Sequence, residues 1–190
     1  MIRFRSVGFV LGQLIGAIAV SMLVPLGYAL YVGDALGPIA VPLAITGATS
    51  LMLMLLTGRP TRDLSQREAL LLTVAAWLAL AFFGCLPFMF TPHFNGFTDC
   101  FFESVSGFTT TGATVLSRVE VLSPSVQLWR CFTHWLGGLG IIVLALAVLP
   151  LVGHGGMQLY RAEFSGARSE KLKPRVAETA RALWMVYVGL

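Results

Sequence analysis

The chain has 190 residues, of which 56% are hydrophobic and only 12% charged, and its formal net charge is +4. A soluble domain usually carries about a quarter charged residues, so this chain has too few polar side chains to cover a globule in water. The bilayer is the expected solvent, and a soluble catalytic domain is excluded because no polar segment is long enough to build one. The chain is not expected to be an enzyme.

Long apolar runs follow in chain order. Crossing a hydrocarbon core of ~30 Å takes about 20 apolar residues, and segments in hydrocarbon must satisfy their own backbone as helices. Four runs meet this length, and a fifth begins near Val176 and continues to Leu190. The predicted fold class is therefore an all-α membrane protein. The four runs cover residues 7–31, 38–57, 69–90 and 126–151.

The first run carries three glycines at four-residue spacing, Gly8, Gly12 and Gly16. This spacing places three bare patches on one helix face and permits close contact with another helix. A helix of the same chain is the favoured neighbour, and a homodimer seam is the alternative. The run is too long for a signal peptide, so residues 1–60 are interpreted as an N-terminal transmembrane helical hairpin.

The lysine and arginine residues predict the orientation, because cytoplasmic loops are enriched in both. Only Arg118 and Arg130 fall in segments assigned to the outside. The N-terminus is therefore expected in the cytoplasm, and topology explains the basic charge without a nucleic-acid partner. The residues assigned to the cytoplasmic side are Arg3, Arg5, Arg59, Arg62, Arg67, Arg161, Arg168, Lys171, Lys173, Arg175 and Arg181.

The segment between the third and fourth runs, residues 97–108, is aromatic but too short to cross a membrane. Both neighbouring helices have their connected ends on the outside, so this segment must enter the membrane and return on the same side. It is predicted to be a half-helix. Thr98 or Asp99 is expected to cap its N-terminus, and Gly107 is expected to end it in a left-handed conformation.

The sequence TTTGAT at 109–114 follows directly. A potassium ion exchanges its water shell for a ring of oxygens, which the backbone carbonyls of an extended loop supply. Glycine permits unusual backbone angles, threonine hydroxyls can line or anchor the loop, and the half-helix points its negative end toward the ion. Between two spanning helices, this run predicts an ion filter rather than an ordinary surface loop.

The stretch FESVSGFTTTGATVL at 102–116 resembles the first pore loop of the Trk/Ktr/HKT potassium transporters. The stretches WRCFTHWLGGLGIIVLALAVLP at 129–150 and KPRVAETARALWMVYVGL at 173–190 support the likeness. In that family, a helical pair precedes four helix–pore loop–helix repeats around one potassium path. The resemblance implies a first repeat at 65–151, a cytoplasmic loop at 152–174 and the start of a second repeat at 175–190.

By this resemblance, Thr110, Thr111 and Gly112 are the potassium-lining positions, with Thr109 and Ala113 beside them. Gly112 favours potassium, because serine at this place in relatives is associated with sodium permeation. No covalent cofactor is implied, and K⁺ is the transported ion.

Two acids on the half-helix, Asp99 and Glu103, are four residues apart near the predicted outer mouth. They could concentrate cations there. The alternatives are a helix cap for Asp99 and a hydrogen-bonded buried acid for Glu103.

The resemblance implies potassium uptake by the membrane subunit of a Trk-type transporter in the bacterial inner membrane. Its implied partners are the cytosolic nucleotide-binding ring protein TrkA and, in the full-length form, a second copy. One filter loop cannot encircle an ion, so the remaining repeats would come from a longer product or from other copies. The alternative is a membrane structural or assembly protein with no ion conduction of its own.

Other polar residues give weaker signals. Cys85, Cys100 and Cys131 are far apart in the sequence and are interpreted as packing residues rather than a metal or redox site. Arg130 and His134 form a candidate intramembrane ionisable pair, with snorkelling to the outer interface as the simpler alternative.

Three glycines inside the fourth run, Gly137, Gly138 and Gly140, are interpreted as packing positions, with a hinge as the alternative. The basic stretch 161–175 could contact anionic lipid or the regulatory partner.

Overall fold

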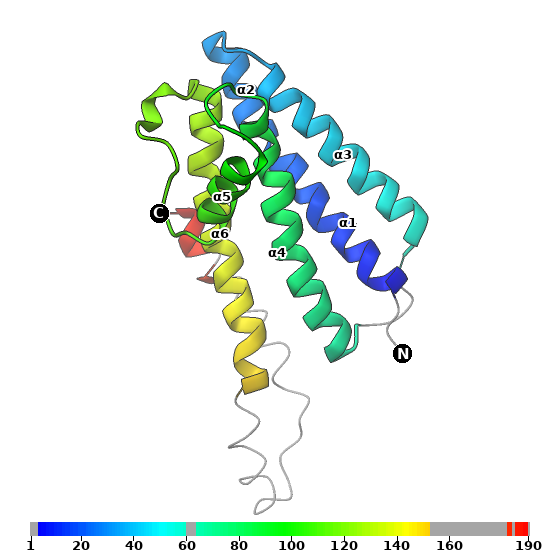
Figure 1. Cartoon of the computed structure of the whole chain (residues 1–190). Coiled ribbons are helices and arrows are strands. Elements are labelled where there is room, and N and C mark those ends of the chain that lie inside the picture. Colours follow the sequence, from blue (N-terminus) through cyan, green and yellow to red (C-terminus); the bar gives the residue numbers. More distant parts are fainter. Residues whose placement is uncertain (1–3, 60–63, 153–181, 184, 190) are drawn as a thin grey trace, which may run out of the picture. The chain divides into compact units, whose positions relative to one another are not determined.

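Helices account for most of the computed structural model of the chain, which describes residues 4–59, 64–152, 182–183 and 185–189. These parts contain no strand, so the predicted all-α class is confirmed. The chain forms two compact units, Met1–His134 and Trp135–Leu190. The elements in chain order are α1 (Phe4–Ser21), α2 (Leu23–Val32), α3 (Gly37–Thr57), α4 (Gln66–Met89), α5 (Phe97–Phe108), the 3-10 helix η1 (Val119–Val121) and α6 (Pro124–Val152) (Figure 1).

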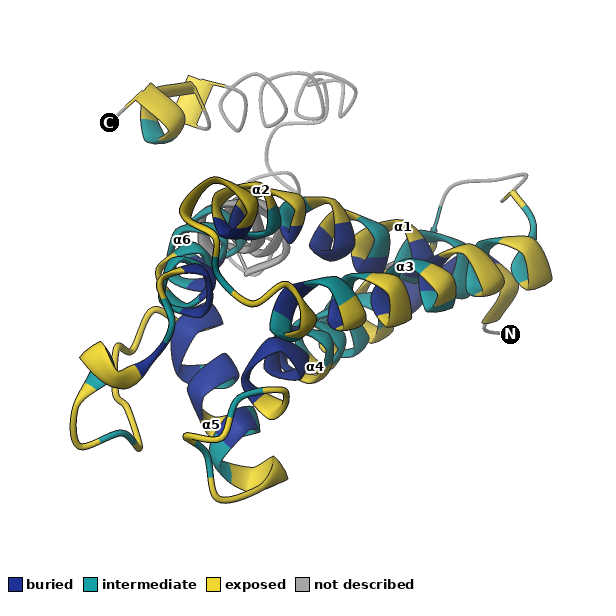
Figure 2. Cartoon of the chain, turned by 90° about the horizontal axis from the view of Figure 1, so that it is seen from above, coloured by how far each residue is buried: buried dark blue, intermediate teal, exposed yellow. Residues whose placement is uncertain are grey.

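Within the part of the chain that the structure describes, three segments are long and apolar enough to cross a bilayer, namely Phe4–Val32, Gly37–Thr57 and Arg67–Met89. Less than a third of each segment is buried within the chain. Figure 2 shows this as exposed residues along the outer sides of α1 and α3. Apolar helix surface of this extent needs lipid or further protein around it, as expected for an integral membrane protein.

The fourth predicted span corresponds to α6, whose 29 residues give a helix long enough to cross a membrane. The side chains of residues 141–152 lie outside the described set. So does nearly all of the predicted cytoplasmic loop 152–174, including the basic stretch. Of the predicted second-repeat start, the structure describes residues 182–183 and 185–189, and they are helical.

The first apolar run forms two helices rather than one. α1 ends at Ser21 and α2 begins at Leu23, with Met22 as a turn between them. The physical reason is Pro25, which has no backbone N–H to donate to Ser21 and whose ring crowds that carbonyl. The predicted span over residues 7–31 is therefore present as one candidate membrane span, Phe4–Val32, with a turn inside it.

The glycine face of α1 packs against α3 of the same chain. A Cβ added to Gly12 would lie 3.3 Å from the backbone oxygen of Ser50, and one on Gly16 would lie 2.7 Å from the Ser50 Oγ. The Ser50 hydroxyl also donates to the Gly12 carbonyl oxygen at 2.7 Å. At Gly8, an added Cβ would lie 2.6 Å from Thr57. The favoured interpretation, packing within one chain, is confirmed.

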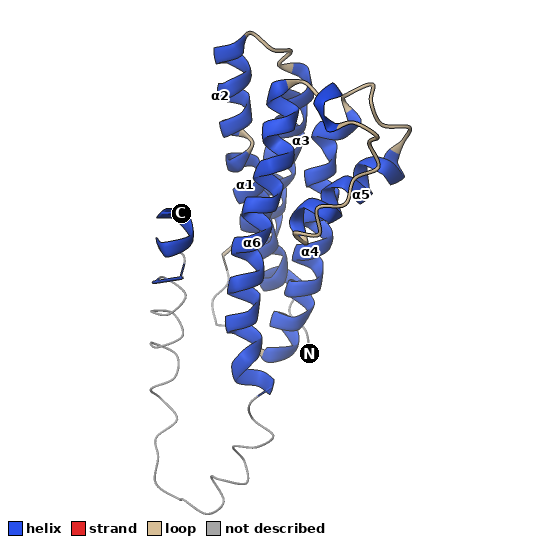
Figure 3. Ribbon diagram, turned by 90° about the vertical axis from the view of Figure 1, so that its left-hand side faces the viewer, coloured by secondary structure: helices blue, strands red, loops and turns tan. Residues whose placement is uncertain are grey.

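α5 runs obliquely to the long helices, and the loop after it turns back toward the end at which α5 began (Figure 3). Its N-cap is Gly96, which makes no side-chain cap, and Asp99 instead accepts a hydrogen bond from the Asn95 N–H at 3.2 Å. Neither Thr98 nor Asp99 therefore occupies the predicted capping position. The course of the segment is that of a half-helix that enters and returns on one side.

Candidate functional site

The half-helix α5 lies against α4 and the first turns of α6, and close contacts at two glycines hold it there. A Cβ on Gly84 of α4 would lie 2.4 Å from the Phe108 ring, and a Cβ on Gly107 would lie 2.2 Å from the Thr133 Oγ1. The fully buried Trp129 of α6 donates from its indole N–H to the Gly84 carbonyl oxygen at 3.0 Å. Figure 2 shows buried residues on the sides of α4 and α5 that face each other.

Gly107 therefore does not end the half-helix. It lies inside α5, which continues to Phe108, and the C-cap residue Thr109 has φ −83°. The positive φ angles come later, at Thr110 (58°) and Gly112 (77°). The predicted role of Gly107 as a left-handed stop was wrong, because the glycine is needed for contact with Thr133 rather than for backbone freedom.

The loop at 109–114 is folded back onto the end of α5. The N–H of Thr111 donates to the Ser106 carbonyl oxygen at 3.0 Å, and the N–H of Thr110 donates to that of Gly107 at 2.9 Å. A left-handed conformation is costly for a residue with a side chain. At Thr110 its own hydroxyl helps to stabilise it by donating to the Thr109 carbonyl oxygen at 2.7 Å.

Threonine hydroxyls anchor this loop. The Thr109 hydroxyl donates to the Val105 carbonyl oxygen at 2.7 Å and also lies 2.8 Å from the Thr111 Oγ1. The Thr114 hydroxyl donates to the Glu103 Oε2 at 2.9 Å. Each of these side chains is therefore held by the loop or by α5.

The carbonyl oxygens of the loop differ in what they bind. The Thr109 oxygen accepts from the Thr110 hydroxyl at 2.7 Å, and the Ala113 oxygen accepts from the Ser106 hydroxyl at 2.6 Å. Between them, the carbonyl oxygens of Thr110, Thr111 and Gly112 accept no hydrogen bond from any residue that the structure describes. The loop thus presents three consecutive free backbone oxygens on an exposed stretch.

Glu103 is the central anchor beneath this loop and is only 1% exposed. Its Oε1 accepts a hydrogen bond from the Arg130 Nε at 2.5 Å, and its Oε2 accepts from the Thr114 hydroxyl and from the Val115 N–H at 3.3 Å. The carboxylate therefore joins Thr114 and Val115, at the end of the loop, to both α5 and α6. This geometry corresponds to the hydrogen-bonded buried acid considered from the sequence.

Arg130 turns inward to this carboxylate, and its side chain is 14% exposed. The predicted ionisable pair with His134 does not form. The Arg130 guanidinium pairs with Glu103 instead, and the His134 Nδ1 lies 2.9 Å from the backbone carbonyl oxygen of Arg130. Snorkelling of Arg130 was likewise a wrong expectation. A signal was available, because Arg130 is the basic residue in the first turns of α6 and a buried charge needs an opposite partner.

A second polar contact, which the sequence did not indicate, joins the loop after α2 to the start of α6. The Asp34 Oδ2 accepts from the Ser125 N–H at 3.1 Å and from the Ser125 hydroxyl at 2.5 Å. The first N–H groups of a helix have no partner within it, so Asp34 caps α6 from 91 residues away. Partial burial raises the pKa of Asp34, but the hydrogen bonds outweigh it and hold that pKa below its usual value.

The cysteines and the second unit supply no further site. Cys85 and Cys100 are buried and Cys131 is exposed, and all three are free. Across the described residues there is no group of three or more His, Cys, Asp or Glu that could hold a metal ion. Within the second unit, Gly138 contacts Tyr187, whose hydroxyl donates to the Trp135 carbonyl oxygen at 3.1 Å, so Gly138 is a packing position.

Comparison with known proteins identifies the family. The family described as TrkH, cation transport protein, matches residues 40–190. The chain belongs to the TrkH family. It is similar to the Trk system potassium uptake protein TrkH of Vibrio parahaemolyticus, with 42% identity over 99% of this chain and 39% of the relative. It is similar to TrkH of Escherichia coli K12, with 41% identity over 99% of this chain and 40% of the relative.

The crystal structure of the potassium transporter TrkH from Vibrio parahaemolyticus has the same fold. It matches with a TM-score of 0.81 and 36% sequence identity, covering 100% of this chain and 38% of that one. The TrkH-family chain thus spans about two fifths of the length of these relatives. Its relatives are named as transporters rather than enzymes, and the fold predicted from the pore-loop resemblance is confirmed.

Proposed function

We propose that this chain supplies the first pore-loop repeat of a Trk-type potassium uptake transporter in the bacterial inner membrane. The observation that carries the proposal is the set of three free carbonyl oxygens at Thr110, Thr111 and Gly112. They stand at the C-terminal end of a buried half-helix, between carbonyls that are already hydrogen-bonded. The relatives named as potassium uptake proteins, and the fold shared with a potassium transporter, support the choice of ion.

The geometry suits passive conduction with selectivity. Backbone oxygens replace the water shell of a potassium ion, and the partial negative charge at the C-terminus of α5 favours a cation there. The hydroxyls of Thr109 and Thr111 contact each other rather than stand free, so their role is to fix the loop. Gly112 adopts φ 77° without the strain that a side chain would add.

The two acids take different parts in this proposal. Glu103 is buried beneath the loop and fully engaged, so it acts as an anchor and not as a cation collector. Asp99 is partly exposed near the start of α5 and keeps a modest attraction for cations, although one of its oxygens is bound to Asn95.

A cytoplasmic N-terminus follows from the distribution of arginine and lysine. The contact between Asp34 and Ser125 supports one part of this topology, the placement of the loop after α2 and the start of α6 on the same side of the membrane. The proposed organisation remains a helical hairpin at 1–60, a first repeat at 65–151, a cytoplasmic loop at 152–174 and a second-repeat start at 175–190.

One repeat provides a quarter of an ion path, so the proposal requires three further pore loops. We place these in the rest of a longer product, as the lengths of the relatives suggest. Other copies of the chain are the alternative source. The proposed partners are the bilayer, the cytosolic ring protein TrkA and a second full-length copy.

The test uses a chimaera in which these 190 residues replace the matching segment of Vibrio parahaemolyticus TrkH. Potassium flux into proteoliposomes is expected, with preference over sodium, and is expected to depend on Gly112. A folded chimaera that carries no potassium would instead favour a structural or assembly role for this segment. Labelling of a cysteine placed at Thr111 by a membrane-impermeant reagent checks the topology, and access from the cytoplasmic side alone would overturn it.

A further inference from the structure

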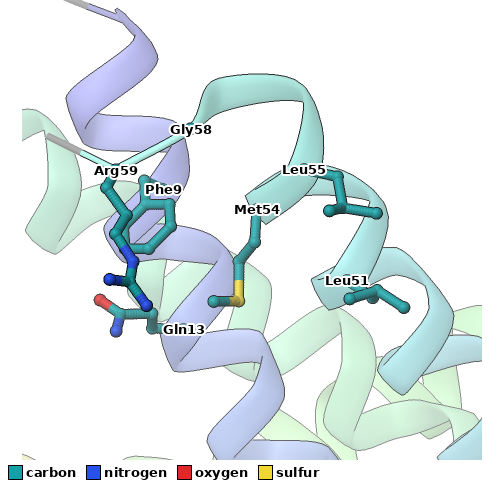
Figure 4. Close-up of a pocket in the computed structure, with 7 residues that line it drawn as sticks. All are labelled: Phe9, Gln13, Leu51, Met54, Leu55, Gly58 and Arg59. Atoms are coloured by element: carbon teal, nitrogen blue, oxygen red, sulfur yellow. The ribbon is translucent and has the colours of Figure 1, made fainter.

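A groove separate from the candidate filter lies between the N-terminal half of α1 and the C-terminal end of α3 (Figure 4). Its volume is about 500 Å³, within the ~300–1,000 Å³ typical of ligand sites. The walls are made of apolar side chains from both helices. These are Phe9, Leu51, Met54 and Leu55.

Two polar side chains, Gln13 and Arg59, also line this apolar groove. Figure 4 shows the Arg59 guanidinium extending beside Phe9 toward the amide of Gln13. Arg59 follows the last turn of α3, so its charge stands at the end of the groove where the helices leave the membrane. A guanidinium above apolar walls matches a ligand with a charged head and a hydrocarbon body.

Gln13 provides an independent observation. It is an exposed amide within the apolar segment Phe4–Val32, and it hydrogen-bonds to no residue that the structure describes. In hydrocarbon, a polar group without a hydrogen-bond partner is strongly unfavourable. The Gln13 amide, which can both donate and accept, is therefore expected to hydrogen-bond to a polar group of a ligand that reaches below the membrane surface.

A second guanidinium lies at this end of the groove. Arg5 donates to the Thr57 carbonyl oxygen at 3.2 Å, and its guanidinium lies next to Gly58. Arg5, at the start of α1, and Arg59 thus both lie at the end of α3, and neither has an acidic partner among the described residues. Two unpaired guanidinium groups favour an anionic occupant.

We propose that this groove binds an anionic phospholipid. Arg59 contacts the phosphate, Gln13 hydrogen-bonds to an ester carbonyl, and an acyl chain lies along Leu51 and Leu55. A phospholipid meets each requirement, because it carries its negative charge, its ester groups and its hydrocarbon in that order from the membrane surface inward. The site does not depend on the proposed ion path.

The test measures association of spin-labelled phosphatidylglycerol and phosphatidylcholine with the full chain in vesicles. Wild type is expected to prefer phosphatidylglycerol, and Arg59→Gln is expected to lower this preference about fivefold, because the guanidinium that contacts the lipid phosphate in the groove is lost. Arg59→Lys should keep most of it. The matched control is Arg118→Gln, which removes an exposed arginine from the loop after the filter and should leave the preference unchanged.

Gln13→Leu separates the two polar contacts. Both lipids carry ester carbonyls, so this variant should weaken the association of both while leaving their ratio as in wild type. Equal association of the two lipids with wild type would overturn the proposal, and so would equal losses in Arg59→Gln and Arg118→Gln. Arg59→Gln could lower the preference for phosphatidylglycerol in the 190-residue chain but not in the full-length chimaera. That result would show that protein covers the groove, and it would also overturn the proposal.

Discussion

The Arg130 Nε donates to the Glu103 Oε1 at 2.5 Å and so joins the half-helix α5 to α6, the helix that follows the loop at 109–114. The other oxygen of the same carboxylate holds Thr114 and Val115. One buried acid therefore connects α5, the loop that follows it and α6. Loss of the pair should disturb both the stability of the chain and the position of the loop.

Glu103→Gln is expected to lower the free energy of unfolding by ~3–5 kcal/mol, because it leaves the Arg130 charge buried without its partner. The thermal unfolding midpoint in detergent measures this. Glu120→Gln, at an exposed acid of η1, is the control and should change little. Replacing both charges, with Glu103→Leu and Arg130→Met, should recover part of the loss. Equal midpoints for Glu103→Gln and Glu120→Gln would rule out a structural role for the pair.

Gly112→Ala should affect selectivity more than stability. No atom lies within 4 Å of an added Cβ, but φ 77° is unfavourable for alanine by ~1–2 kcal/mol. Relief of this strain would turn the Gly112 carbonyl away from its neighbours. We expect the chimaera to lose much of its preference for potassium over sodium in proteoliposome flux. Gly27→Ala, at an equally open helical position, is the control, and an unchanged preference in Gly112→Ala would refute the filter assignment.

Gly107→Ala should destabilise the contact between α5 and α6. The new methyl group would lie 2.2 Å from the Thr133 Oγ1 and 3.0 Å from its Cβ, and overpacking of this kind costs ~1–3 kcal/mol. Thr133→Ala removes the closer atom, so the double variant should recover part of the unfolding midpoint. If the double variant unfolds as early as Gly107→Ala alone, then the contact with Thr133 is not the reason for glycine at this position.

Asp34→Asn should reduce stability in a pH-dependent way. The folded pKa of Asp34 lies below the unfolded value of about 3.8, so its contribution is fully present above that pH and is lost as the pH falls through the folded pKa. The difference in unfolding midpoint between wild type and Asp34→Asn should therefore be larger at pH 6 than at pH 3. An equal difference at both pH values would contradict the prediction.

The architecture could be predicted from the sequence because it depends on local patterns. Apolar runs of the right length predict spanning helices, and a short apolar segment between two outward ends predicts a half-helix. The motif around Gly112 placed the loop at the end of that half-helix. These features need only the neighbouring residues and the constraint that hydrocarbon imposes on a backbone.

The contacts that hold the site were harder to predict because they join distant residues. Glu103 and Arg130 are 27 residues apart, and Asp34 and Ser125 are 91 apart. A single sequence does not indicate which charges meet. Gly107 was misjudged for the same reason, since a glycine required for contact and a glycine required for a left-handed turn look alike until the facing helix is known.

The cap on α6 also bears on how such proteins can be recombined. The acid comes from the loop after α2, and the serine that it holds opens the last helix of the repeat. A crossover between two relatives anywhere from residue 60 to residue 120 would inherit these groups from different parents. Hybrids joined there are expected to assemble poorly unless both parents supply a matching acid and hydroxyl. Junctions beyond residue 134 keep Asp34 and Ser125 from the same parent.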